Sequence, residues 1–168
     1  DYVKTQNQRD LTLEGDIKIT FFPQLGLDSG KMTLSQRNSS KGFASIENAR
    51  FYVAWWPLLH KQLQIERVAL DGVHANLIRY KNGSTNFDDL LATDVSLGNI
   101  KFVIDSVKLK NSSVNLQNET AGLFLALHDV NIETGKLADS TPGDVTASFR
   151  LESAKPRIDT KVKLNSHV

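Results

Sequence analysis

Apolar residues recur at every second position along almost the whole chain, and turn residues separate the runs. Such alternation predicts β-strands with one apolar and one polar face, because successive side chains of a strand point to opposite sides. The clearest runs are Ile17/Ile19/Phe21, Phe51/Val53/Trp55, Val73/Ala75/Leu77, Val114/Leu116, Leu123/Leu125/Leu127 and Val145/Ala147/Phe149/Leu151. The pattern therefore predicts a mainly β fold.

A sheet built from these strands has a large apolar face that needs a cover. The chain shows none of the amphipathic helices that usually provide one. Two arrangements remain open at this point. Either a second sheet from the same chain closes over the face, or the face stays partly open to receive an apolar ligand.

Turn residues set the boundaries of the predicted elements. Residues 43–56 form the longest strand candidate, and Pro57 favours one helical turn directly after it. The pair Asp71-Gly72 between alternating runs predicts a two-residue hairpin. Residues 87–91 are typical of a second short helix. The expected architecture is an antiparallel β-meander with one or two short helices.

One stretch of the chain echoes another. The segment IERVALDGVHANLI from Ile65 matches IDSVKLKNSSVNLQ from Ile104 at five positions, with an offset of 39 residues (104 − 65). Convergence on a strand-turn-strand pattern explains such a match, and so does a repeated hairpin unit in an extending sheet. The sequence leaves both explanations open.

Length and charge limit the class of protein. The 168 residues suffice for one β-rich domain, residues 1–168, with a real core. A net charge of +1 argues against a nucleic-acid partner, because nucleic-acid binders usually show a concentrated basic stripe. The absence of cysteine excludes disulfides and suits an oxidising compartment such as the periplasm.

Both ends of the sequence look cut. It opens at Asp1 and ends at Val168 inside an alternating run, and no stretch is long and apolar enough to span a membrane. We therefore expect an N-terminal fragment of a longer protein. Residues 1–10 are interpreted as a polar tail that follows a missing transmembrane helix.

Residues for catalysis or metal binding do not gather in the sequence. The four histidines, His60, His74, His128 and His167, lie in separate segments without ligand spacing. The adjacent pair Asp88-Asp89 is better explained as helix N-terminal acids than as a catalytic pair. No nucleophile elbow, phosphate loop or dinucleotide fingerprint is present. We expect no enzyme, no metal and no cofactor.

The pair Trp55-Trp56 allows two interpretations. Tryptophan is enriched where membranes meet water, which suggests membrane contact. Tryptophan is also a large core residue with one polar group, and this interpretation is the one that we favour from the sequence.

An ordered series of segments between Leu11 and Leu91 resembles the N-terminal region of the AsmA family of bacterial envelope proteins. The segments are GDIKI at 15–19, FPQLGL at 22–27, GKMTL at 30–34, FASIENAR at 43–50, VAWWPLL at 53–59, IERVALDG at 65–72 and NFDDL at 86–90. The family more often has aliphatic residues where this chain has Trp55-Trp56. For residues 100–168 the resemblance rests on compatible strand patterning alone.

The resemblance implies a periplasmic β-rich body anchored in the bacterial inner membrane by one N-terminal helix. It also implies that the antiparallel β-meander is curved, as an open trough or partial barrel. Such proteins are similar to TamB and to chorein-type bridge lipid-transfer proteins, whose apolar trough is proposed to carry phospholipid acyl chains towards the outer membrane. Phospholipid, the inner membrane and outer-membrane or envelope proteins would be the partners. The residues expected to line the trough are Ile17, Ile19, Phe21, Phe51, Val53, Trp55, Val68, Leu70, Val107, Leu109, Val114 and Leu116.

A second hypothesis comes from a different class of function. The alternating pattern at residues 161–164 predicts a strand at the edge of the sheet. An exposed edge strand can pair with a strand of another protein. The chain would then be an envelope assembly module rather than a lipid carrier.

Overall fold

The computed structural model describes residues 8–21, 24–61, 63–91, 100–135 and 143–167. Ten strands in this part of the chain form one sheet, accompanied by two short helices. The elements are β1 Leu11–Glu14, β2 Lys18–Thr20, β3 Leu25–Ser29, β4 Lys31–Ser35, β5 Gly42–Val53, α2 Trp55–Leu59, β6 Leu63–Arg79, α3 Asp88–Leu91, β7 Ile100–Asn118, β8 Leu123–Thr134, β9 Asp144–Ala154 and β10 Arg157–His167.

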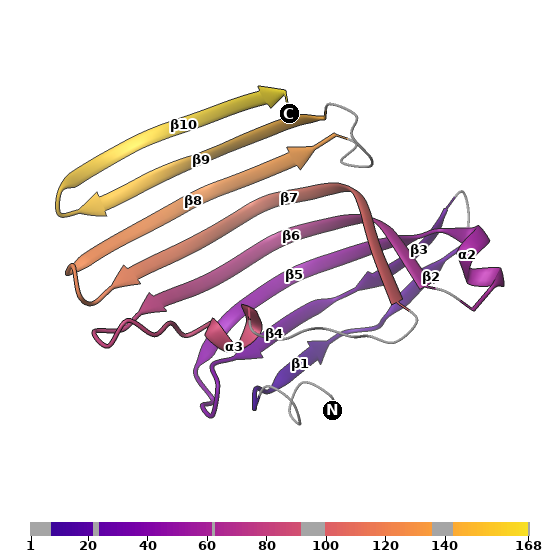
Figure 1. Ribbon diagram of the computed structural model, residues 1–168, viewed down its shortest axis with the longest axis horizontal. Coiled ribbons are helices and arrows are strands. Elements are labelled where there is room, and N and C mark those ends of the chain that lie inside the picture. Colours follow the sequence, from indigo (N-terminus) through magenta and orange to yellow (C-terminus); the bar gives the residue numbers. More distant parts are fainter. Residues whose placement is uncertain (1–7, 22–23, 62, 92–99, 136–142, 168) are drawn as a thin grey trace.

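The strands lie side by side in a single layer, in the order β1-β4-β5-β6-β7-β8-β9-β10 (Figure 1). Strand β3 pairs with β5 beside β4, and β2 pairs with β3. The first and last strands of the order do not pair with each other, so the sheet stays open. The predicted mainly β fold with short helices is thereby confirmed.

One pair of neighbours differs from the antiparallel meander expected from the sequence. Strands β6 and β7 are parallel, whereas the other described pairs are antiparallel. A parallel neighbour requires the chain to return to the opposite end of the sheet before the next strand begins. The chain between Arg79 and Ile100, of which the structure describes residues 80–91 with α3, connects these two parallel strands.

The predicted hairpin at Asp71-Gly72 is wrong. Strand β6 runs without interruption from Leu63 to Arg79. A two-residue type I′ turn needs positive φ at both central residues, but here only Gly72 has one, at +64°. The single left-handed residue bends the strand instead of reversing it.

Kinks with a positive φ lie side by side on three neighbouring strands, and the pairing of Ile46 with Val73 and of Ala49 with Leu70 shows that β5 bends in step with β6. Asn111 of β7 and Asp129 of β8 also have positive φ, at +50° and +52°. Pairing of Asp71 with Lys110 places the first two kinks in one line, and register shifts flank the kinks of β7 and β8. Each kink adds one residue to the alternation of faces.

The register shows the effect of the kinks on side-chain direction. Val130 and Ile132 of β8 lie two residues apart and share a face. Their partners on β7 are Ser112 and Leu109, which must share that face although they are three positions apart in the sequence. Apolar positions thus stay on one side of the sheet along the whole of each kinked strand.

The internal echo of 39 residues corresponds to the register of the parallel pair. Val68 pairs with Val107 and Leu77 pairs with Leu116, both at this offset. The echo is therefore two kinked strands lying side by side. It is not a repeated hairpin, because the predicted turn positions are kinks.

Strand β5 ends at Val53, three residues earlier than the predicted strand 43–56. Trp55 begins helix α2, which contains the predicted helical turn at Pro57. Proline has no N–H for a strand ladder but is tolerated in the first turn of a helix, which explains this change of structure. The predicted helix at 87–91 is confirmed as α3.

One buried polar cluster fixes the beginning of the described chain. Arg9 is only 1% exposed, although the sequence analysis places it in a polar tail. Its guanidinium donates two hydrogen bonds of 2.7 Å to Asp89 of α3 and others to the carbonyls of Ser35 and Asn86, and it stacks over the Phe43 ring. The segment before β1 is thus fastened to β4, β5 and α3.

Candidate functional site

Apolar side chains line up in rows that cross the strands. One row begins at Leu70 of β6 and continues through Leu109, Ile132 and Ala147 to Leu164 of β10. Residues directly opposite each other on neighbouring strands have their side chains on the same face. The row therefore forms an uninterrupted apolar strip across five strands.

Further rows flank this strip on the same face. We call this side the apolar face, and register places on it Ile19, Leu25, Leu27, Met32, Leu34, Ala44, Ile46, Ala49, Phe51, Val53, Val68, Leu70, Val73, Ala75, Leu77, Val107, Leu109, Val114, Leu116, Leu123, Leu125, Leu127, Val130, Ile132, Val145, Ala147, Phe149, Leu151, Ile158, Val162 and Leu164.

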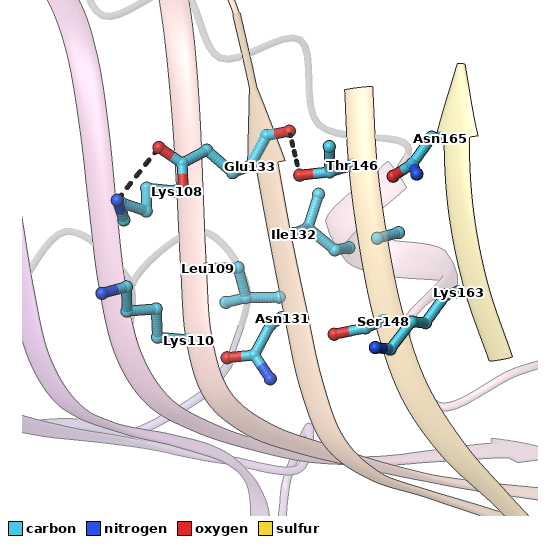
Figure 2. Close-up of a pocket in the computed structure, with 11 residues that line it drawn as sticks. Lys108, Leu109, Lys110, Asn131, Ile132, Glu133, Thr146, Ser148, Lys163 and Asn165 are labelled. Carbon is cyan, nitrogen blue, oxygen red and sulfur yellow. Dashed lines mark hydrogen bonds and ion pairs between the residues drawn. The ribbon is translucent and has the colours of Figure 1, made fainter. Parts of the chain in front are cut away.

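The opposite side of the sheet is polar over β7–β10. The row Lys108, Glu133, Thr146 and Asn165 lies directly beside the apolar strip and, by alternation, points the other way. Figure 2 shows these side chains around a shallow depression of about 250 Å³. Lys108 forms an ion pair of 3.0 Å with Glu133 there. We call this side the polar face.

No second layer covers the apolar face in the part of the chain that the structure describes (Figure 1). Most of its side chains are only partly buried, and Leu164 is 55% exposed. The chain exposes 11404 Å². A globular monomer of its mass, 18.7 kDa, would expose about 8300 Å². A sheet with one uncovered face contributes to such an excess.

The apolar face is hollowed at one end of the strands. A depression of about 440 Å³ lies over Leu77, Leu116 and Leu125, which occupy one row of β6, β7 and β8. Phe87, directly before α3, forms part of its wall, and Arg79 lies at its polar margin. The segment around α3 thus turns this end of the open face into a groove.

Nine of the twelve residues predicted to line a trough share the apolar face. They are Ile19, Phe51, Val53, Val68, Leu70, Val107, Leu109, Val114 and Leu116. Ile17 and Phe21 lie just outside the paired residues of β2 and are exposed. Trp55 lies in α2 and not in a strand.

The residues predicted to line the trough end at Leu116 of β7, but the apolar face continues beyond it. Leu125, Ile132, Phe149 and Val162 extend the same face over β8, β9 and β10. Their alternation is as regular as that of the residues that were chosen, so the signal for them was present in the sequence. What the sequence could not supply was the pairing that aligns these strands with β6 and β7.

Helix α2 forms a second apolar surface, separate from the strands. Trp56 is 74% exposed and Leu59 is 68% exposed, and no residue of the helix is buried. The interpretation of Trp55 and Trp56 as core residues is therefore wrong. The indoles lie in a short helix beyond the end of β5, where the Trp56 ring makes an edge contact with His60.

The titratable side chains whose pKa values shift in the described residues form hydrogen bonds within the fold. The hydrogen bonds from Arg9 hold the pKa of the Asp89 carboxyl below its ordinary value. Bonds from Thr85 likewise lower the pKa of Asp88. Within the described ranges no group of histidine and carboxylate side chains is suited to hold a metal ion. No helix found there has the length and apolar character needed to cross a membrane.

The fold and the face together define a class: an open, single-layer β-sheet protein with one continuous, uncovered apolar face. The AsmA family model matches residues 1–166, and the chain belongs to the AsmA family. Membership indicates a protein of the bacterial cell envelope with an envelope-related function.

A curated relative is protein AsmA of Escherichia coli strain K12, which is 29% identical over 124 residues. The match covers 70% of this chain and 20% of that protein, so the chain spans about a fifth of the length of its relative. No solved structure matches the chain.

Proposed function

We propose that this protein carries phospholipid in the periplasm, with the acyl chains lying on the apolar face and moving towards the outer membrane. The observation that supports the proposal is the set of uninterrupted apolar rows that run across the strands without a covering layer. In this proposal a segment outside the described residues anchors the chain to the inner membrane.

The proposed mechanism is passive. Burial of each acyl CH₂ against the face contributes about 0.8 kcal/mol, and neighbouring strands present similar alkyl side chains. A chain moving along a row therefore exchanges one contact for an equivalent one. The eight strands of the sheet order span seven spacings, roughly 34 Å in all. One leaflet of hydrocarbon is about 15 Å thick, so an acyl chain fits along a row.

We also propose that no catalytic step is involved. The cargo would meet the alkyl and aromatic side chains of the apolar face, while the polar headgroup stays in water beside the sheet. The Arg79 side chain lies beside the groove of Leu77, Leu116 and Leu125, where it can approach a headgroup phosphate.

Native mass spectrometry of the protein, followed by organic extraction and lipid identification, tests the proposal. Leu109→Asp places a charge in the central apolar row, so we expect loss of co-purifying and added phospholipid. Lys110→Asp is the matched control, because it changes the neighbouring residue on the polar face of the same strand. This variant should keep its lipid.

Circular dichroism of both variants must show the native strand content. A protein without bound phospholipid, and without uptake of added phospholipid, would contradict the proposal. Equal lipid binding by Leu109→Asp and Lys110→Asp would also contradict it, because binding would then not use the apolar rows.

A second candidate function rests on the edge of the sheet. Strand β10 pairs with β9 along eleven residues and stands last in the sheet order. Its other edge can accept a strand from an envelope protein by β-augmentation. Lys161→Pro, on the polar face of β10, would reduce such pairing. Lipid uptake by the groove over β6–β8 would continue, which separates the two functions.

A further inference from the structure

Helix α2 projects from the sheet at the ends of β5 and β6, where Figure 1 also places β2 and β3. It is tied to the sheet by the hydrogen bond of 3.0 Å from the Ala54 N–H to the Gln64 carbonyl. Phe21, which follows β2, is 63% exposed and lies at the same end of the strands as α2. Three aromatic residues therefore gather where strands of the apolar face end.

The chemistry of this projection is that of a membrane interface. Trp55, Trp56, Leu58 and Leu59 are all exposed in a helix of five residues. Exposure of such a patch to water is unfavourable, whereas indole rings are most stable at the level of lipid headgroups. The helix is too short to enter the hydrocarbon core, so it would lie at the surface.

Charge around α2 selects an anionic partner. From Asn48 to Ile65 the sequence contains no acidic residue; it contains Arg50, which is paired with Asp28 of β3, and the basic residues His60 and Lys61. The last two follow the helix directly and are exposed. Basic residues beside an apolar surface are attracted to anionic lipid headgroups.

We propose that α2, with Trp55, Trp56, Leu58 and Leu59, is a docking foot that inserts into the headgroup region of an anionic lipid bilayer. The foot stands apart from the apolar face. It would hold the end of the sheet at β2, β3 and β5 against a membrane, so that lipid leaving the bilayer meets the first apolar rows. The inference goes beyond lipid carriage, because docking requires no lipid to leave the membrane.

The two tryptophans of the chain are Trp55 and Trp56, so intrinsic tryptophan fluorescence reports on α2 alone. The probe is a unilamellar vesicle of phosphatidylethanolamine and phosphatidylglycerol, with phosphatidylcholine vesicles for comparison. We expect a blue shift and protection from aqueous quenchers on the anionic vesicles, and a weaker effect on phosphatidylcholine. Brominated lipids should quench the indoles most strongly when the bromine lies near the headgroups.

The double variant Leu58→Ser/Leu59→Ser keeps both indoles and removes exposed alkyl surface. It should bind anionic vesicles at least about tenfold more weakly in co-sedimentation. Phe124→Ser is the matched control, because Phe124 is 49% exposed on the opposite side of the sheet from Leu125. This variant should bind vesicles as the unchanged protein does.

Three results would overturn the docking foot. The first is an unshifted spectrum on anionic vesicles, and the second is equal binding by the double variant. The third is a blue shift without vesicles that grows with protein concentration, which would show that α2 joins two copies of the chain. Leu109→Asp separates this proposal from lipid carriage: it should lose lipid uptake and keep the vesicle-dependent shift.

Discussion

Arg9 shows how one buried side chain can hold several elements. Its charge lies among Asp89, the carbonyls of Ser35 and Asn86 and the Phe43 ring. Burial of a charge is tolerated only when partners replace its water, and here the partners come from β4, β5 and the segment that contains α3. The sequence could not show that Arg9 is buried, because a polar segment with a buried arginine has the same composition as a solvated tail.

Asp89→Asn should lower the free energy of unfolding by about 3 kcal/mol, since it leaves the Arg9 guanidinium buried without its counter-charge. Urea denaturation measures the change. Asp159→Asn is the control, because Asp159 forms a similar two-bond pair with Arg150 on the exposed surface. That change should have little effect on stability.

The Asp89 contribution also depends on pH. Since the folded state lowers the pKa of Asp89 below the ordinary 3.8, the stabilisation is complete above that value. It is lost as the pH falls through the lowered pKa of the folded state. The difference between the protein and Asp89→Asn should therefore disappear in strong acid. A difference that stays constant through the acid range would show that the pair is not the cause.

At the scale of single elements, the kinks of β6, β7 and β8 decide the faces of the sheet. Gly72 is the left-handed residue of β6, and a Cβ at this position would lie 2.6 Å from Cγ of Glu47. Asn111 occupies the equivalent position of β7, and asparagine tolerates positive φ better than most residues. The kinks keep the apolar rows aligned on both sides of the bend.

Gly72→Ala should cost about 1–2 kcal/mol for the left-handed backbone, with a further loss from the contact with Glu47. Gly83→Ala is the matched control, because Gly83 also has positive φ but has no heavy atom within 4 Å of the added Cβ. Urea denaturation of both variants measures the two costs. Equal losses would mean that Glu47 moves freely and that the close approach has no energetic consequence.

The strands were predictable from the sequence, but their connections were not. A shift of apolar positions from Leu70 to Val73 fits a hairpin and a kink equally well, since both keep the two side chains on one face. The choice is made by the parallel pairing of Val68 with Val107, which is a long-range contact. Local alternation therefore defined the apolar side of each strand, and only the fold showed which strands are neighbours.

For the molecule as a whole, the open face sets the thermodynamics of unfolding. The chain has few buried apolar side chains in its described part: Leu25, Phe43, Ala49, Val53, Ala54, Ile65, Ala126 and Val130. The rest of its apolar side chains remain partly hydrated. Folding without lipid thus removes less apolar area from water than folding of a globular protein of equal length.

Differential scanning calorimetry can measure this difference as the heat capacity of unfolding. A globular chain of 168 residues would give about 2.0–2.5 kcal/mol/K. We expect a lower value for the lipid-free protein, because apolar hydration dominates the heat capacity. The value should rise when phospholipid covers the face. A lipid-free monomer with the full globular value would contradict an open face.

The single-layer order of the strands has a consequence for how such a protein can change in evolution. Strand length sets the width of the sheet, and the number of strands sets the distance across it, about 4.8 Å for each strand. Duplication of one β-hairpin would therefore lengthen the path by about 10 Å and leave its cross-section unchanged. The distance across the sheet and its width therefore depend on different features of the gene, strand number and strand length. Selection can extend one without changing the other.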